Sequence, residues 1–448
     1  MEENKMGIMP VNRLILSMSL PIMISMLVQA LYNIVDSIFV SQINENALTA
    51  VSMAFPIQNL MIAVGVGTAV GVNALLARSL GEKDYDKVNR IAANSVFLTI
   101  LSYLLFLVIG LFWVEAFYTS QTDIEEIVQY GKEYLTVCCY FSFGAFVQLM
   151  FERLLQATGK TIYTMFTQGI GAIVNIIMDP ILIFGLMGFP KMGVTGAAAA
   201  TVIGQIVAGL LAVWINAKKN HEVQIHMKGF RPDLPVIGQI YGIAVPSIIM
   251  QAIGSVMNYG MNRILISFTS TATAVFGVYF KLQSFVFMPV FGLNNGIIPI
   301  VAYNYGAKNK ERVTNTIRYT VAYAMGIMVL GLLVFQAIPE PLLLLFNASE
   351  TMIAIGIPAL RIISLSFVLA GFCIACGSVF QALGRSVYSM LVSVARQLLV
   401  LLPVAYGLAR LGSVNLVWWA IPIAELMSLA MTLFFMVRIY RRVLSGLS

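Results

Sequence analysis

Charged residues are scarce in this chain of 448 residues: they make up 10% of it, whereas hydrophobic residues make up 59%. A soluble domain usually carries about 25% charged residues, so the composition excludes an ordinary globular protein. The mean hydropathy of +0.87 instead indicates helices that cross a membrane. The alternating ten-residue pattern of an outer-membrane β-barrel is absent. We therefore predict an all-α polytopic membrane protein.

Residues for metal and redox chemistry are also few. The chain has four cysteines and two histidines. Cys373 and Cys376 form a CxxC, but no second CxxC follows, and His221 and His226 share one distant loop. Small buried residues one helical turn apart explain this cysteine pair better than a metal site does. We expect neither a resident metal nor another cofactor.

Several motifs that would indicate other classes of protein are missing. Without a GxxxxGK[ST] loop, the chain is not expected to hydrolyse ATP. Without DxxD or DDxxD motifs, a membrane-bound prenyl or phosphatidyl transferase is disfavoured, so we do not expect an enzyme. The start, MEENKMGIMPVNR, lacks the pattern of a cleaved leader. The net charge of +7 comes from residues spread over alternate loops, which speaks against a nucleic-acid partner.

Twelve apolar segments are long enough to span a bilayer. The predicted spans are at about 14–40, 49–77, 90–116, 127–152, 162–186, 193–216, 237–266, 272–302, 316–338, 352–381, 387–409 and 414–437. One set of alternating loops and tails carries 20 Lys and Arg residues, and the other set carries 3. Because positive residues concentrate in cytoplasmic loops, both termini are predicted to be cytoplasmic.

An internal repeat relates the two halves of the chain at a constant offset of 225 residues. Pro21 matches Pro246, and QATGKTIYTM at 156–165 aligns with QALGRSVYSM at 381–390 without a gap. Further matches at this offset are Asn33 with Asn258, Phe55 with Phe280, Gln58 with Gln283, Gly67 with Gly292 and Gly71 with Gly296. The repeat predicts two structurally similar halves.

Each half holds six spans, so both repeats enter the membrane in the same direction. They are therefore predicted to be lobes related by an axis along the membrane normal. The predicted domains are an N-terminal six-helix lobe at 1–216, a cytoplasmic linker at 217–235 and a C-terminal six-helix lobe at 236–448. This architecture is typical of a secondary transporter, whose site is expected near the interface of the repeats.

Polar residues in one layer of the first lobe could bind a coupling cation. Asp36 lies about 5 residues from the outer end of its span, and Asp179 and Thr201 each lie about 8 residues from theirs, which is roughly 7 to 12 Å. Asn175 lies one helical turn from Asp179. Oxygen ligands from several helices suit a hard cation such as Na⁺, and two nearby carboxylates can instead share a proton.

The first predicted span carries a polar stripe that includes Asp36. Gln29, Tyr32, Asn33 and Asp36 recur at i, i+3, i+4 and i+7, so Tyr32 and Asn33 are predicted neighbours of the cation site. The alternative is structural: each aspartate could bond to carbonyls that a nearby proline leaves free. That alternative does not explain why the two carboxylates lie at similar depth.

The second lobe lacks the same residues. At the offset of 225, Asp36 becomes Met261, Asn175 becomes Val400 and Asp179 becomes Val404. We therefore predict a coupling site confined to the first lobe.

Two other acidic residues, Glu115 and Glu152, lie at the ends of predicted spans, where water reaches them. We predict that both are interfacial.

The second lobe instead carries four bases within its spans: Arg263, Lys281, Arg361 and Arg396. Arg396 and Glu425 each lie about ten residues into consecutive antiparallel spans, which a short loop joins. An unpaired arginine at this depth is costly. We therefore predict that Arg396 and Glu425 form a structural ion pair and not a second ion site.

These features together resemble the multidrug and toxic compound extrusion (MATE) transporters. The resemblance rests on the 6+6 repeat, the first-span stripe with Pro21 and Asp36, NIIMDP at 175–180, MGVTGAAAAT at 192–201 and the paired QATGK and QALGR segments. It covers essentially the whole chain. The pattern looks most similar to the bacterial branch with two aspartates in the first lobe.

Membership of this family implies export of amphipathic, often cationic, compounds in exchange for inward H⁺ or Na⁺, by rocking between two conformations. It implies cation-coupling roles for Asp36, Asn175, Asp179 and Thr201. Some relatives carry a carboxylate in the seventh span, where this chain reads Ile249, Met250 and Gln251, so coupling in the second lobe is not expected. The resemblance also implies small-molecule substrates, contact with membrane lipid, a monomer and a bacterial inner membrane.

Two other transporter classes share part of this pattern. A major facilitator transporter would carry a G-x-x-x-D-R-x-G-R-R-like loop after span 2, whereas this loop reads RSLGEKDYDKVNR. A flippase for lipids or lipid-linked oligosaccharides, from the related superfamily, tends to have a strongly basic cavity and often fourteen spans. The four bases of the second lobe keep the flippase as the alternative.

Overall fold

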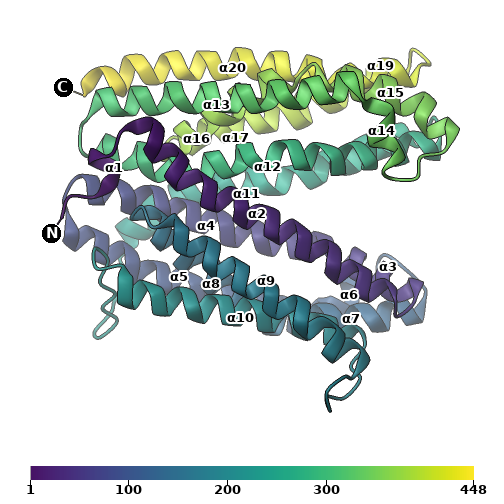
Figure 1. Ribbon diagram of the computed structural model, residues 1–448, viewed down its shortest axis with the longest axis horizontal. Coiled ribbons are helices and arrows are strands. Elements are labelled where there is room, and N and C mark those ends of the chain that lie inside the picture. Colours follow the sequence, from purple (N-terminus) through teal and green to yellow (C-terminus); the bar gives the residue numbers. More distant parts are fainter. Residues whose placement is uncertain (1, 448) are drawn as a thin grey trace. The chain divides into compact units, whose positions relative to one another are not determined.

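The computed structural model describes residues 2–447, which are almost entirely helical and contain no strand (Figure 1). The longer helices of the first half are α2 (Val11–Ser41), α3 (Glu45–Met53), α4 (Phe55–Gly81), α5 (Tyr85–Phe112), α7 (Glu125–Tyr140), α8 (Phe143–Ala157), α9 (Thr161–Phe184) and α10 (Val194–Lys219). Those of the second half are α11 (Leu234–Leu265), α12 (Ser270–Gly306), α13 (Lys310–Ala337), α15 (Glu350–Ser364), α16 (Phe367–Ala382), α17 (Ser386–Val394), α18 (Leu402–Ala409) and α20 (Ala420–Arg442). Short elements are α1 (Lys5–Ile8), α6 (Val114–Thr119), α14 (Pro339–Leu344), η1 (Ala395–Leu401), α19 (Val414–Trp418) and η2 (Leu444–Gly446).

Ten of these helices or continuous helix pairs are long and apolar enough to cross a membrane, and two bent pairs bring the number to twelve. The bent pairs are α7 with α8, at 44°, and α15 with α16, at 49°. They correspond to the predicted spans 127–152 and 352–381. The prediction of an all-α membrane protein with twelve spans is therefore confirmed, and two of its spans are broken helices.

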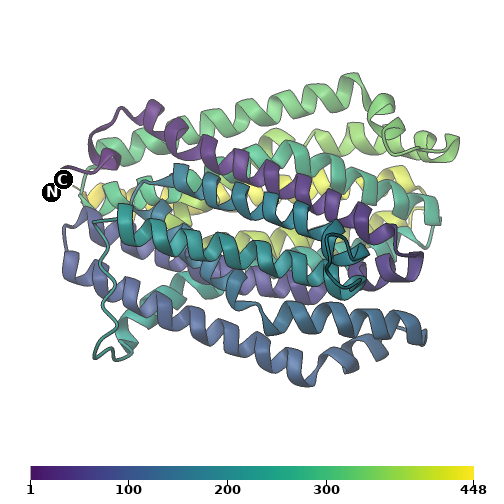
Figure 2. The same ribbon diagram turned by 60° about the horizontal axis from the view of Figure 1, so that its bottom comes forward.

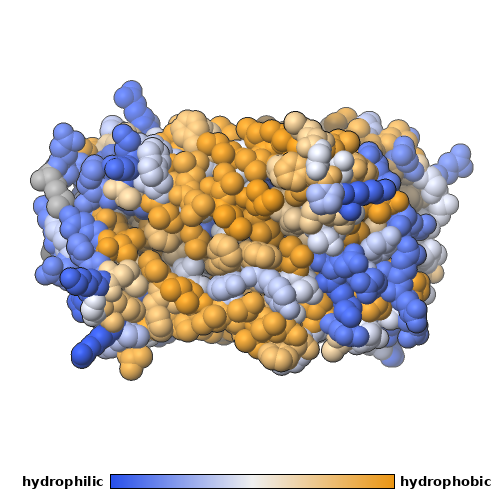
Figure 3. Space-filling model, turned by 90° about the horizontal axis from the view of Figure 1, so that it is seen from below, coloured by the Kyte–Doolittle hydropathy of each residue, from blue (hydrophilic) through white to orange (hydrophobic). Residues whose placement is uncertain are grey.

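The exposed surface has the polarity that a membrane protein needs. On the face drawn in Figure 3, hydrophobic residues fill the middle and hydrophilic residues gather at the two ends. The exposed side chains of α13 include Leu330 and Leu333, and those of α20 include Leu426 and Phe434. Lipid can cover such side chains without loss of hydrogen bonds.

The chain divides into two compact units. The first unit comprises Met1–Asn4 and Leu20–Ile248, and the second comprises Lys5–Ser19 and Ile249–Ser448. Helices α2 and α11 are each divided within two residues of Pro21 or Pro246, the prolines that match in the repeat. The units thus differ from the predicted lobes, 1–216 and 236–448. The first part of α11 belongs to the first unit, and the first part of α2 belongs to the second unit.

Matching glycines explain how each unit holds this helix segment. A Cβ on Gly71 would lie 2.5 Å from the carbonyl oxygen of Ile240, and a Cβ on Gly296 would lie 2.4 Å from Ser19 Oγ. No real side chain fits at such distances, so α4 and α12 need glycine where a helix crosses them closely. The repeat of Gly71 and Gly296 is therefore a packing requirement in both units.

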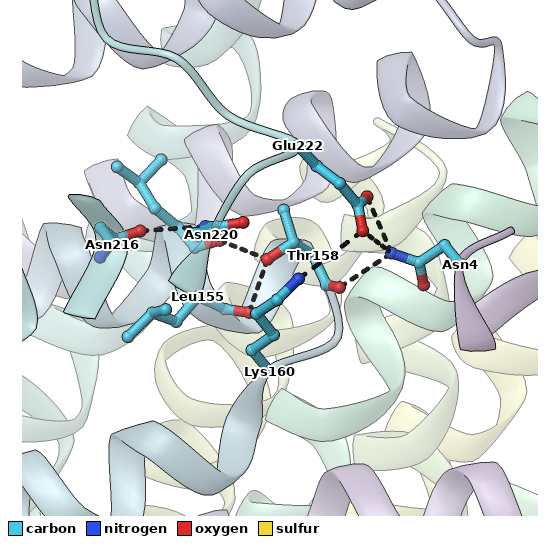
Figure 4. A network of polar contacts seen from close by, with 8 residues as sticks. Asn4, Leu155, Thr158, Lys160, Asn216, Asn220 and Glu222 are labelled. Carbon is cyan, nitrogen blue, oxygen red and sulfur yellow. Dashed lines mark hydrogen bonds and ion pairs between the residues drawn. The ribbon is translucent and has the colours of Figure 1, made fainter. Parts of the chain in front are cut away.

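Polar contacts hold the tail and the linker at one end of the first unit (Figure 4). Asn4 Nδ2 donates to Glu222 Oε2 at 2.9 Å and to the carbonyl oxygen of Thr158 at 2.9 Å, and Lys160 Nζ lies 3.6 Å from Glu222 Oε1. Further along the linker, Asp233 pairs with Arg90 at 3.1 Å.

The second unit holds the next tail residues in a similar way. Arg312 Nη2 donates to the carbonyl oxygens of Met6, at 2.9 Å, and Met9, at 2.7 Å. The connecting segments are therefore ordered parts of the two units.

Candidate functional site

The close packing of α9 against α10 positions the predicted cation site in the first unit. Figure 2 shows these helices from a second direction. A Cβ on Gly204 of α10 would lie 2.7 Å from the carbonyl oxygen of Gly171 of α9, and 3.2 Å from Asn175 Cβ. Two glycines at the crossing thus let the backbones touch. This contact brings Asn175 beside Thr201.

Asn175 joins Asp179 to Thr201. In the amide orientation that satisfies both ends of its side chain, Asn175 Nδ2 donates to Asp179 Oδ2 at 3.0 Å. Its Oδ1 accepts from the backbone N–H and from Oγ1 of Thr201, each at 3.2 Å. Asn175 and Asp179 are buried, with 2% and 0% of their surfaces exposed. Three of the four predicted cation-coupling residues therefore form one connected group.

The fourth residue, Asp36 of α2, meets this group through its carboxyl. The carboxyl groups of Asp36 and Asp179 lie near enough to interact electrostatically, and a hydrogen bond between them would require that one of them carries a proton. Oδ1 of each aspartate is buried and has no hydrogen-bond partner among residues 2–447. Buried acceptors without a donor are rare, and a proton or a bound cation would satisfy them.

The two predicted neighbours of the site are placed differently. Tyr32 lies close enough to both aspartates to interact with them electrostatically, and Gln29 lies one turn before it on α2. The side chain of Asn33 is exposed, and its carbonyl oxygen accepts from Ser37 Oγ at 2.9 Å. Tyr32 is therefore part of this polar cluster, and Asn33 lies on an open face of α2.

Sequence reasoning missed a second set of polar side chains near Asp36. Gln58 Nε2 of α4 donates to the hydroxyl of Tyr134 at 3.1 Å and lies 3.9 Å from Cys138 Sγ. Tyr134 and Cys138, both on α7, interact electrostatically with Asp36. Gln58 was visible as a match in the repeat, and Tyr134 and Cys138 share one face of their helix. No motif linked them to the aspartates.

The donor set of the polar cluster consists of oxygen atoms from carboxyl, amide and hydroxyl groups. Carboxylate, amide and hydroxyl oxygens are ligands for hard cations. Within the part of the chain that the structure describes, no group of three or more His, Cys, Asp or Glu side chains could hold a metal. The four cysteines are free and buried. The arrangement can therefore exchange one proton, or one small cation, at a pair of carboxylates.

Arg396 and Glu425 meet in the second unit. Arg396 Nη1 lies 3.1 Å from Glu425 Oε1, and 23% and 8% of the two side chains are exposed. Arg396 lies in η1, a short π-helix within the line of α17 and α18. Tyr279 of α12 interacts electrostatically with both members of the pair. The contact has the form expected from the depths of the two residues in the sequence, and its structural role stays a prediction.

The two acidic residues at predicted span ends have different surroundings. Glu115 is 67% exposed and pairs with Lys132 at 3.2 Å, as an interfacial residue would. The prediction that Glu152 is interfacial is wrong, because only 2% of its surface is exposed.

Three donors enclose the Glu152 carboxylate: Gln148 Nε2 at 3.1 Å, Thr167 Oγ1 at 2.7 Å and Gln168 Nε2 at 2.8 Å. Two of these donors come from α9, which covers this part of α8. The position of Glu152 near the end of a span suggested exposure to water, but the neighbouring helix α9 supplies its polar surroundings instead.

Comparisons with known proteins agree with this geometry. The sequence profile of the MatE family matches residues 21–181 and 246–407, one segment in each half of the repeat. Multidrug export protein MepA of Staphylococcus haemolyticus is 28% identical over 410 residues, which cover 91% of this chain and 89% of the relative.

Two solved structures are similar over nearly the whole chain. One is described as an outward-facing conformation of a multidrug resistance MATE family transporter of the MOP superfamily; its TM-score is 0.91 at 25% identity, with 98% of each chain covered. The other is a MOP superfamily transporter from Pyrococcus furiosus, described as having a binding pocket of reverse polarity that suggests a different function; its TM-score is 0.89 at 25% identity, with 98% of each chain covered. The chain is thus a multi-pass membrane protein and a transporter rather than an enzyme, and it belongs to the MatE family.

Proposed function

We propose that this transporter is a secondary active multidrug efflux antiporter, which exports amphipathic, often cationic, compounds in exchange for inward H⁺ or Na⁺. The observation that carries this proposal is the proximity of Asp36 and Asp179, each of which has a buried oxygen without a partner among residues 2–447. The name of MepA, a multidrug export protein, supports the choice of substrate class.

The coupling step is assigned to the first unit. Asn175 holds Asp179 and Thr201 together, so a cation or proton that binds between Asp36 and Asp179 also fixes α9 against α10 and α2. Release of the ion leaves two carboxylates facing each other, and their repulsion favours separation of these helices. Binding and release of the coupling ion would thus bias the unit between two packings.

Further expectations belong to the same proposal. The coupling ion is H⁺ or Na⁺, and no resident cofactor is needed. The transporter functions as a monomer in a bacterial inner membrane, in contact with lipid, with both termini in the cytoplasm. The excess of positive loops on one side supports this orientation.

The experiment is dye export by proteoliposomes under separately imposed Na⁺ and pH gradients. Asp36→Asn should abolish gradient-driven export while the protein still folds and inserts. Asp123→Asn is the matched control, because Asp123 is exposed in the loop that precedes α7. Export at the wild-type rate by Asp36→Asn would overturn the coupling role, and an identical response to both gradients would overturn the choice of a single coupling ion.

The flippase alternative rests on the bases of the second unit. Arg396 is paired with Glu425, so the number of free bases in this unit is smaller than the sequence alone implies. This pairing favours the antiporter. Transfer of a fluorescent lipid across the bilayer at the rate of dye export would favour the flippase.

A further inference from the structure

Arginines from two neighbouring helices come together at one end of the second unit. The ring of Tyr388 in α17 stacks on the ring of Phe435 in α20, with 4.4 Å between their centroids and 8° between their planes. Arg385 precedes Tyr388 by three residues, and Arg438 follows Phe435 by three residues. Because the two helices run in opposite directions, both arginines lie about one turn beyond the stacked rings, at the same end. Arg442 follows Arg438 by one further turn.

The charges of these arginines have no acidic partner in the part of the chain that the structure describes. From residue 249 onwards the sequence contains ten Arg and three Lys, but four Glu and no Asp. No salt bridge among residues 2–447 includes Arg385, Arg438 or Arg442. Arg385 and Arg442 are exposed, and Arg438 is half-buried. Neighbouring positive charges repel one another, so a bound anion would stabilise this end of the unit.

The end of α20 lies at the depth of the lipid headgroups. Trp419, which precedes the helix, is 40% exposed, and exposed aromatic residues of this kind are typical of a membrane interface. Arg438 follows Trp419 by nineteen residues, or about 28 Å of helix, which matches a hydrocarbon layer of about 30 Å. Arg438 therefore lies at the opposite interface, which the predicted orientation places in the cytoplasmic leaflet.

An apolar surface leads along the two helices to the arginines. Phe434 lies one turn before Arg438 on the same face of α20, and 63% of it is exposed. Leu426 lies two turns before Phe434 and is exposed as well. On α17, Val387 and Leu391 are exposed and one turn apart. A molecule with apolar chains and a negatively charged head would cover this surface and neutralise the arginines at its end.

We propose that the paired ends of α17 and α20 bind the headgroup of an anionic phospholipid, such as phosphatidylglycerol, in the cytoplasmic leaflet. Guanidinium groups bind phosphate through two parallel N–H···O hydrogen bonds, and basic clusters at this depth attract anionic headgroups. A free phosphate ion would meet the charges but leave the apolar surface uncovered. The site lies within the second unit, apart from Asp36 and Asp179, and does not depend on the export function.

The test is titration of the purified full-length protein in nonionic detergent with phosphatidylglycerol or phosphatidylcholine, with bound lipid counted by native mass spectrometry. The wild type should bind phosphatidylglycerol more tightly, and inorganic phosphate should not displace it. Each arginine near an anionic headgroup strengthens binding about fivefold, so Arg385→Gln with Arg438→Gln should weaken the binding of phosphatidylglycerol about thirtyfold. The same double change should alter the binding of phosphatidylcholine less than about twofold, and replacement of both arginines by lysine should restore most of the preference.

Lys310→Gln is the matched control, because Lys310 is exposed, forms no salt bridge among residues 2–447 and precedes a helix of the same unit on the same side of the predicted membrane. Elution volume and melting temperature show whether each variant is folded, and Arg438→Gln alone, with an expected loss of about fivefold, serves if the double variant is not. The proposal is overturned if the wild type binds both lipids equally, if Lys310→Gln loses as much binding as Arg438→Gln, or if inorganic phosphate displaces the bound lipid.

Discussion

Replacing Gly204 with alanine tests whether helix spacing sets up the candidate cation site. A Cβ at Gly204 would lie 2.7 Å from the carbonyl oxygen of Gly171, whereas ordinary contact begins at 3.4 Å. Helix α10 must therefore move away from α9 by the difference, about 0.7 Å. The same movement lengthens the two 3.2 Å bonds from Thr201 to Asn175 Oδ1 to about 3.9 Å, beyond hydrogen-bonding distance.

The expected loss is functional more than structural. Crowding of this kind costs about 1–3 kcal/mol, and alanine in place of glycine within a helix returns about 0.5–1 kcal/mol. The net loss of unfolding free energy is then about 0–2.5 kcal/mol, small enough for the protein to stay folded. Because Thr201 is no longer bonded to Asn175, which links it to Asp179, gradient-driven export should fall at least about tenfold.

The same helix pair offers a matched control. Gly169 lies on α9, two residues before Gly171, and a Cβ there would meet nothing within 4 Å. Gly169→Ala should export at the wild-type rate and gain about 0.5–1 kcal/mol in stability. The assay is the initial rate of dye export under an imposed ion gradient, together with the melting temperature. Wild-type export and unchanged ion dependence in Gly204→Ala would refute the argument from helix spacing.

Three further changes test other parts of the chain. Glu425→Gln should lower the unfolding free energy by about 3–5 kcal/mol, because it leaves the buried charge of Arg396 without a partner. The double variant Arg396→Met with Glu425→Leu should lose less stability. Equal losses in a denaturation assay would count against a structural pair. Asp179→Asn should change the pH dependence of export, since a shared proton needs both carboxyls, and an unaltered pH profile would exclude proton sharing. Glu152→Leu should lower the melting temperature, because it removes the buried acceptor of three side-chain hydrogen bonds, each worth about 1 kcal/mol. Glu152→Gln should cost less, and similar melting temperatures would argue against a buried hydrogen-bonded carboxylate.

Residue depth was sufficient to predict which helices supply the candidate site. Asp36, Asp179 and Thr201 lie at similar distances from the ends of their spans, so their side chains can meet where those helices pack together. Asn175 follows from helical periodicity alone. Arg396 and Glu425 meet for the same reason, since a short connection joins their spans.

Sequence periodicity could not reveal features that depend on contacts between distant segments. Glu152 is buried because Thr167 and Gln168 of the next helix cover it, and its own position in the sequence suggested exposure. The break between α7 and α8 lies at Phe141 and Ser142, and neither residue is a proline or a glycine. The π-helix at Ala395–Leu401 ends two residues before Pro403, which lacks the N–H of a regular helical bond, but a proline does not by itself predict a π-helix.

The repeat separates what packing requires from what the candidate site requires. Gly71 and Gly296 are both glycine because each unit must accept a helix at the same close crossing. Asn175 bridges Asp179 and Thr201, whereas the matching positions of Asn175 and Asp179 are Val400 and Val404. A buried amide without its polar partners is costly, so the loss of the carboxyl favours loss of the amide as well.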